Sequence, residues 1–275
     1  MSAAAWLVTG AGSGVGRALA IALASTGAEV LLAGRNRARL DETARWCWAP
    51  SQSFEVDLAD PSSVAALVGS VAVHLGTRPL AGIVHAAGIM TWNSDATALG
   101  WSMVPLVNAV APWRLTLALE PLLLAGTGAR VLLVAGAPFT LRGLRPDADT
   151  WLGSHKGRGL ALALEAAAGK VWLARSLHRR WAGRASAFAF HPGYVRSHLA
   201  GGLPLPFRAL GLLAQPFLSK RSLTGEFLAL DPAAPALSGT LVSGRRGIDN
   251  CPAAPDPEAE DAFALRLVSS PPTGR

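Results

Sequence analysis

The fold is decided by Thr9-Gly10-Ala11-Gly12-Ser13-Gly14-Val15-Gly16. This stretch follows the apolar run Trp6–Val8 and opens a helix-like segment, Gly14–Ser25. Glycines allow the backbone to turn tightly and to approach a pyrophosphate, while the N-terminus of the next helix supplies N–H donors and the positive end of its dipole. The strand, the turn and the helix together predict a dinucleotide-binding unit of the Rossmann type.

Outward from this turn, strand-like and helix-like segments alternate over most of the chain. The predicted strands are Trp6–Val8, Glu29–Ala33, Ser53–Val56, Gly82–His85, Arg130–Val134, Ala187–Phe190 and Leu237–Val242. The predicted helices are Gly14–Ser25, Arg37–Trp46, Ser62–Leu75, Leu99–Leu124, Leu160–Trp181 and Glu258–Val268. Such alternation predicts an α/β fold with a doubly wound parallel sheet of about seven strands.

No repeat and no low-complexity linker divides the sequence, so we expect one domain over residues 1–275. Residues 198–220 are apolar and rich in Gly, Leu, Pro and Phe. They fit a substrate lid or a packed connector. Residues 245–275 are expected to form a C-terminal tail.

Composition excludes several classes of protein. Hydrophobic residues make up 51% and charged residues 16% of the 275 residues, which is typical of a globular chain with buried parallel strands. The net charge of +7 comes from scattered arginines without a nucleic-acid-binding motif, so we expect an anionic cofactor and no nucleic acid. Cys47 and Cys251 are too few for a disulfide framework, and no metal site is expected.

The segment from Met103 to Ala125 is the longest apolar stretch. Three prolines and two charged residues interrupt it, which favours a buried helix over a membrane span. The N-terminus has no charged region before its first apolar strand, so we expect no signal peptide and a cytoplasmic location.

The Gly-x-x-x-Gly-x-Gly order resembles the short-chain dehydrogenase/reductase superfamily rather than longer-chain dehydrogenases. Further segments carry the same resemblance: Val56-Asp57-Leu58, His85-Ala86-Ala87-Gly88, Val107-Asn108-Ala109-Val110-Ala111-Pro112, and His191-Pro192-Gly193-Tyr194-Val195-Arg196-Ser197. The segment from Ala236 to Thr240, followed by an acidic helix, is similar to the retinol-dehydrogenase-like branch.

The resemblance implies a cofactor site drawn from most of these segments. Its expected members are Thr9, Gly10, Gly12, Ser13, Gly14, Val15, Gly16, Arg35, Asp57, Leu58, Ala86, Ala87, Gly88, Asn108, Pro192, Gly193 and Val195. An NAD enzyme usually has an acid at the end of the second strand, where this chain has Arg35. Because a guanidinium can pair with a 2′-phosphate, we predict NADP(H) over NAD(H).

The family's catalytic Ser, Tyr and Lys are missing. By resemblance their positions fall on Gly136, Ala163 and Ala167, and the one tyrosine of the chain is Tyr194 in the Pro-Gly segment. Asn108, the family's fourth catalytic position, remains, and we expect it to be structural. We therefore do not expect the usual carbonyl reduction through a tyrosine.

Two other residues are candidates for acid–base work. Lys170 lies on the same helical stripe as Ala163 and Ala167, although it is alternatively a lysine whose stem snorkels to an edge. His155 lies in a loop expected to overhang the pocket, and histidine titrates near neutrality. His85 and His191 flank the nicotinamide region and are expected to be structural.

Three functions remain open. The first is an NADP(H)-dependent reductase acting on a hydrophobic small molecule without a catalytic tyrosine. The second is a non-redox cyclase or isomerase whose wide apolar pocket has Trp92, Trp101 and Trp151 nearby. The third is an inactive partner subunit. In the family the two long helices usually pair across a dimer, so Leu99–Leu124 and Leu160–Trp181 predict a homodimer or homotetramer.

Overall fold

The computed structural model describes residues 3–196, 202–206, 213, 215, 218–254 and 256–269. Within them, eight strands form one sheet: β1 (Ala5–Thr9), β2 (Glu29–Gly34), β3 (Ser51–Glu55), β4 (Leu80–His85), β5 (Ala129–Val134), β6 (Ala185–His191), β7 (Leu241–Ser243) and β8 (Arg246–Ile248). Their order is β3-β2-β1-β4-β5-β6-β7-β8. The pairs are parallel except for β7 with β8, so the predicted doubly wound parallel sheet is confirmed with one strand more than expected.

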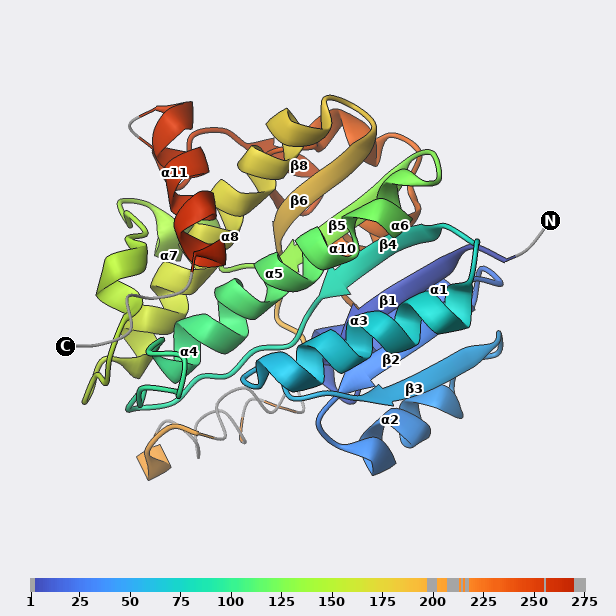
Figure 1. Ribbon diagram of the computed structural model, residues 1–275, viewed down its shortest axis with the longest axis horizontal. Helices are drawn as coiled ribbons and strands as arrows, with labels where there is room; N and C mark the ends of the chain where they lie inside the picture. The colour runs from blue at the N-terminus through green and yellow to red at the C-terminus, as the bar shows by residue number, and fades with distance from the viewer. Residues whose placement is uncertain are drawn as a thin grey trace.

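Helices cover both faces of the sheet (Figure 1). They are α1 (Gly14–Ala24), α2 (Arg37–Ala44), α3 (Pro61–Leu75), α4 (Met103–Pro105), η1 (Leu106–Val110), α5 (Ala111–Ala118), α6 (Glu120–Leu124), α7 (Pro138–Leu141), η2 (Ala148–Trp151), α8 (Gly159–Trp181), α10 (Leu223–Leu230), η5 (Ala234–Leu237) and α11 (Pro257–Val268). Side chains alternate along each strand, so Leu7 packs in the cluster with α3, α5, α8 and α11, whereas Val8 packs with α1, α2 and α10. This burial on both faces explains why the strands are apolar throughout.

The strand order reverses between β1 and β4. Thr9 is paired with Ala33 of β2 and with His85 of β4, so the carboxyl ends of these strands meet at one edge. Ligands of open α/β sheets bind in the crevice outside such a switch point. The Gly-rich turn leaves β1 at this place.

The predicted long helix Leu99–Leu124 is wrong in its continuity. It begins at Met103 and is divided into α4, the π-helical turn η1, α5 and α6. Proline cannot donate a helical hydrogen bond, and Pro105, Pro112 and Pro121 lie at these divisions. The π-helical turn carries Asn108.

The predicted strand Leu237–Val242 is also wrong at its start. Ala234–Leu237 forms the 3-10 helix η5, and β7 begins after Gly239, whose φ of 80° makes a turn. The additional strand β8 closes this edge as a hairpin. Most of the predicted lid, 198–220, lies outside the described residues.

Candidate active site

The glycine-rich turn is packed so tightly that side chains would not fit. A Cβ on Gly16 would lie 2.4 Å from the carbonyl oxygen of Gly10, and a Cβ on Gly10 would lie 2.6 Å from the nitrogen of Ala87. Gly10 and Gly14 also have φ values of 67° and 56°, which favour glycine. The turn therefore brings the start of α1 against the segment that follows β4.

The N-terminus of α1 is left open. Ser13 at the N-cap makes no side-chain capping bond, and the first turn has no acidic residue. The carbonyl oxygens on the other side of the turn are held by α2 and by Arg17: Thr43 Oγ1 donates to Ala11 O at 2.9 Å, and Arg17 donates to Gly12 O at 2.7 Å. The backbone N–H groups in the first turn of α1, at the positive end of the helix dipole, are therefore available to bind an anion.

Arg17 was missed by the sequence analysis. Its guanidinium also pairs with Glu42 at 2.8 Å and donates to Thr43 Oγ1 at 3.0 Å, so it ties the turn to α2. The sequence did contain a signal for this role, because Arg17 follows the glycine-rich turn directly, at the start of the second turn of the helix.

The ends of β2 and β3 supply the next expected residues. Arg35 is exposed directly after Gly34, and among the described residues no hydrogen bond or ion pair holds its guanidinium. The following Asn36 caps α2 by accepting from Arg39 N at 3.0 Å. Asp57 is exposed two residues after the end of β3, and one of its carboxylate oxygens accepts from Ala59 N at 2.9 Å.

The segment after β4, with Ala86, Ala87 and Gly88, is anchored from both sides. Ala87 N donates to Thr9 Oγ1 at 3.3 Å. Asn108 Oδ1 accepts from Ile89 N at 2.8 Å and Asn108 Nδ2 donates to Ile89 O at 2.9 Å. Both polar atoms of the Asn108 side chain are therefore used to position this segment.

The Pro-Gly segment follows β6 at the same edge of the sheet. Ser222 Oγ donates to Pro192 O at 3.0 Å, and Gly193 has a φ of 80°. Val195 forms a parallel bridge with Ser219. Tyr194 is 70% exposed and touches the ring of His191 edge-on, with the ring centroids 5.8 Å apart.

The position expected for the family's Ser is covered by α7. A Cβ on Gly136 would lie 3.0 Å from Leu141 Cδ2 and 3.1 Å from Thr140 Oγ1. Leu141 is fully buried, so an apolar side chain fills part of the space beside Gly136. Thr140, which the sequence analysis did not single out, is a hydroxyl next to this position, and it donates to Ala137 O at 2.7 Å.

Lys170 points inward from α8. It is 5% exposed, and its Nζ donates to the carbonyl oxygen of Val134, the last residue of β5, at 2.8 Å. The alternative that its amine snorkels to an edge is therefore wrong. Burial lowers the pKa of Lys170 from 10.5 to about 8.

His85 lies in the same interior region. Thr116 Oγ1 donates to Pro112 O at 2.9 Å, so it accepts from His85 Nε2 at 2.8 Å. This leaves His85 Nδ1 as a buried acceptor without a hydrogen-bond partner in the part of the chain that the structure describes. Burial, and then the charge of Lys170, lowers the pKa of His85 to about 3, which keeps the ring neutral.

His155 makes no hydrogen bond to Lys170 or His85 among the described residues. Its Nε2 donates to Leu152 O at 2.9 Å, and its backbone is paired with Ser94 in an antiparallel bridge. The side chain is half-buried, and no hydrogen bond or ion pair joins His155 to Lys170 in the described part of the chain. The two acid–base candidates thus have separate hydrogen-bond partners, Leu152 O and Val134 O.

Two of the three tryptophans expected near a wide pocket are core residues instead. Trp101 and Trp151 are fully buried, whereas Trp92 is 44% exposed. Trp151 packs edge-on against Phe263 of α11, with ring centroids 5.2 Å apart. Trp101 and Trp151 therefore belong to the packed core, and a wide apolar pocket near the three tryptophans stays a prediction.

Comparison with known proteins agrees with the geometry. The short chain dehydrogenase family model matches residues 4–137. A Streptomyces sp. (strain C5) protein, DnrU, assigned as a daunorubicin C-13 ketoreductase, is 30% identical over 263 residues, which cover 87% of this chain and 83% of the relative. The chain belongs to the short-chain dehydrogenase/reductase family.

Other relatives extend the comparison. Human retinol dehydrogenase 12 is 29% identical over 199 residues, which cover 70% of this chain and 62% of the relative. The crystal structure of a short chain dehydrogenase from Salmonella enterica serovar Typhi has a TM-score of 0.65 at 21% identity, covering 89% of this chain and 97% of that chain. The similarity to retinol dehydrogenases and the fold are therefore confirmed.

Family membership sets the coarse chemistry. Short-chain dehydrogenases/reductases bind a nicotinamide cofactor, NAD or NADP, and act on small molecules. Among the described residues, no helix is long and apolar enough to cross a membrane.

Proposed function

We propose that this family member is an NADP(H)-dependent oxidoreductase that acts on a hydrophobic small molecule without a catalytic tyrosine. The observation that carries the proposal is the uncapped N-terminus of α1 together with Arg35, directly after β2, which has no ion-pair partner among the described residues. Apart from Asn108 in η1, the proposed cofactor residues lie at the carboxyl ends of β1, β2, β3, β4 and β6, around the point where the strand order reverses.

The turn after β1 suits a pyrophosphate. Gly10 and Gly16 have no room for a Cβ, so a phosphate is able to approach the backbone without meeting side chains. Arg17 and Thr43 donate hydrogen bonds to the carbonyl oxygens of Gly12 and Ala11, which weakens the repulsion between these oxygens and an anion. Backbone N–H groups and the helix dipole then supply the attraction.

Arg35 supports NADP(H) over NAD(H). An acid at this position would accept from the ribose 2′-OH and would repel a 2′-phosphate. Arg35 instead offers a planar set of donors without a competing carboxylate partner among the described residues.

Calorimetry with NADPH and NADH tests this proposal. Replacement Arg35→Asp is expected to weaken NADPH binding about 10- to 100-fold, because hydrogen bonds to a charged group contribute about 1.5–3 kcal/mol, and to change NADH binding far less. Arg45→Asp, with the same charge change past the end of α2, is the matched control. An unchanged NADPH affinity in Arg35→Asp would contradict the NADP assignment, and no binding of either dinucleotide would contradict the proposal as a whole.

The bound nicotinamide would supply or accept a hydride. Lys170 is proposed to hold the proton for this reaction, since its amine is buried on the helical stripe of Ala163 and Ala167 and its pKa is about 8. Gly136, Ala163 and Ala167 contribute no hydroxyl or charge, so the surface near the amine favours an apolar substrate. Neutral His85 beside Lys170 adds no second positive charge.

The redox reading is favoured over the cyclase or isomerase. The relative from Streptomyces bears the name of a ketoreductase, and two of the three tryptophans invoked for a wide pocket, Trp101 and Trp151, are buried. The non-redox enzyme and the inactive partner subunit remain alternatives. A domain spanning residues 1–275, a lid at 198–220, a cytoplasmic location and a homodimer or homotetramer stay predictions.

A further inference from the structure

Helix α11 crosses two helices that lie far before it in the sequence. It packs against α8 and α5 on the outside of the sheet (Figure 1). Helix α8 and, as one piece of Leu99–Leu124, helix α5 belong to the two segments that the sequence predicts to pair across a homodimer. The contacts of α11 therefore decide whether that face is free.

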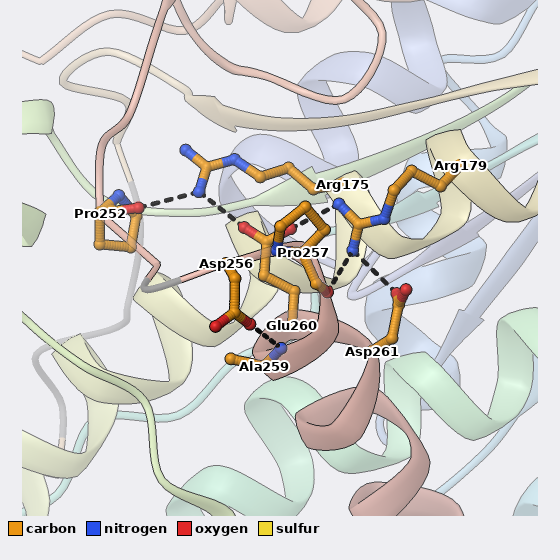
Figure 2. Close-up of polar contacts among 8 residues, drawn as sticks. All are labelled: Arg175, Arg179, Pro252, Asp256, Pro257, Ala259, Glu260 and Asp261. Atoms are coloured by element: carbon orange, nitrogen blue, oxygen red, sulfur yellow. Dashed lines mark hydrogen bonds and ion pairs between the residues drawn. The ribbon is translucent and has the colours of Figure 1, made fainter.

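Glu260 anchors the N-terminal half of α11 to α8. Its carboxylate is 4% exposed and lies between Arg175 at 2.9 Å and Arg179 at 2.6 Å. Arg179 also pairs with Asp261 at 2.8 Å, and Arg175 donates to Pro252 O at 2.9 Å (Figure 2). A buried carboxylate is tolerated only with such partners, so this contact is specific to one placement of the helix.

Phe263 supplies the apolar anchor one turn later. Its ring packs edge-on against Trp151 and Trp172, with centroids 5.2 and 5.6 Å away. Gly169 of α8 makes the space for this contact, since a Cβ there would lie 2.9 Å from both Phe263 and Trp151. The surface of α8 is thus shaped to receive α11 closely.

The two ends of α11 are also satisfied by hydrogen bonds. Asp256 caps the N-terminus by accepting from Ala259 N at 2.7 Å. At the other end Arg114 of α5 donates to Leu267 O at 2.9 Å and to Ser269 O at 3.3 Å, and Trp113 donates to Ala264 O at 2.9 Å. A cation at the C-terminus of a helix also suits its dipole.

We infer that the α5/α8 face is an interaction surface whose partner is the chain's own helix α11, and that it is closed to a second copy of the chain. The same face cannot hold α11 and another α5/α8 pair at once, because Phe263 and Glu260 already occupy the contacts with Trp172, Arg175 and Arg179 of α8. Association of copies through this face would need α11 to be released first. This inference does not depend on the proposed function.

Protection of a thiol beneath α11 tests the inference. Ser176 of α8 is 8% exposed and bonds Asp261, so Ser176→Cys in a Cys47→Ser/Cys251→Ser chain places a thiol under the helix. Maleimide labelling is followed at about 1 µM and about 100 µM chain. Cover by α11 gives the same slow rate at both concentrations, whereas cover by a second copy gives faster labelling on dilution.

Charge reversal supplies the second arm. Glu260→Arg is expected to speed the labelling of the thiol introduced by Ser176→Cys about 100-fold, because it breaks a buried pair. Glu258→Arg makes the same charge change on the exposed side of α11 and is expected to alter the rate less than about twofold. Circular dichroism separates release of α11 from global unfolding, and Glu260→Gln is the milder variant if Glu260→Arg does not fold.

Light scattering completes the design. Slow labelling at both concentrations, with faster labelling in Glu260→Arg, supports the inference. Protection that is lost on dilution, together with a twofold molecular mass at high concentration, would overturn it. Equal labelling of Glu260→Arg and Glu258→Arg would overturn it as well.

Discussion

Lys170 shows how much depends on the direction of one side chain. A lysine on the α8 stripe either reaches the surface or turns its amine into the protein, and both are consistent with its position in the sequence. The structure places the amine at Val134 O with 5% of the residue exposed. A buried ammonium is costly, which is why its pKa is lowered to about 8.

This burial predicts a particular dependence of stability on pH. The folded pKa of Lys170 lies below the unfolded value of 10.5, so the folded state carries the full cost of the charge below pH 8. Between pH 8 and pH 10.5 the folded amine is neutral while the unfolded amine is still protonated. The free energy of unfolding of the wild type should therefore rise by about 3 kcal/mol over this window relative to Lys170→Met.

Urea unfolding of both chains at pH 7 and pH 10 measures this difference. Lys156→Met, which removes an exposed lysine, is the matched control and should run parallel to the wild type. Parallel pH profiles for the wild type and Lys170→Met would show that the amine is solvated. In the proposed reaction, the rate of reduction should also fall above pH 8 as Lys170 loses its proton.

At the scale of elements, prolines and glycines decide where helices begin, break and approach one another. Pro105, Pro112 and Pro121 divide the segment that the apolar pattern predicts as one helix. The break at η1 gives Asn108 its position beside Ile89. A pattern of apolar residues does not reveal such a division, because each piece keeps the same buried face.

Two helical glycines should respond in opposite ways to alanine. In α3, Gly69 is exposed with nothing within 4 Å of a new Cβ, so Gly69→Ala should stabilise the chain by about 0.5–1 kcal/mol through helix propensity. In α1, the Cβ of Gly16→Ala would lie 2.4 Å from Gly10 O, so the turn must shift and both stability and dinucleotide affinity should fall. Thermal unfolding and calorimetry measure both effects. Wild-type dinucleotide affinity in Gly16→Ala would contradict the packed turn as the phosphate site.

At the scale of the whole molecule, ligand binding is expected to stabilise the fold. The proposed site draws on turns after five strands of the sheet, so a dinucleotide bound there would contact segments from residue 9 to residue 195. NADPH at about 100 times its dissociation constant should raise the free energy of unfolding by about 2.7 kcal/mol.

Thermal unfolding with increasing NADPH checks this effect. The shift should follow the logarithm of the NADPH concentration and should be smaller for NADH at equal concentration. Loss of the shift in Arg35→Asp would connect it with the 2′-phosphate. A shift that is equal for both dinucleotides would speak against selection by Arg35.

The whole chain also shows why the placement of α11 was not foreseen. Glu258–Val268 is predicted as a helix, and its acidic residues are visible in the sequence. Their partners, Arg175 and Arg179, are about 80 residues away and appear as ordinary exposed positions of another helix. The contact depends on the placement of α8 on the sheet, which no local pattern contains.

The sequence by itself determined the α/β class, most strands and helices, the glycine-rich turn and the absence of the family's Tyr. These follow from local chemistry. Strands buried on both faces must be apolar, and a phosphate-binding turn must have glycines. Because the single tyrosine of the chain is Tyr194, no tyrosine is available for the family's catalytic position. Tertiary structure alone decided that Lys170 is buried, that Leu141 covers Gly136, that Trp101 and Trp151 are core, and that α11 covers α5 and α8. The physical reason is that burial and pairing depend on neighbours distant along the chain, and packing selects which of several locally permitted directions each side chain takes.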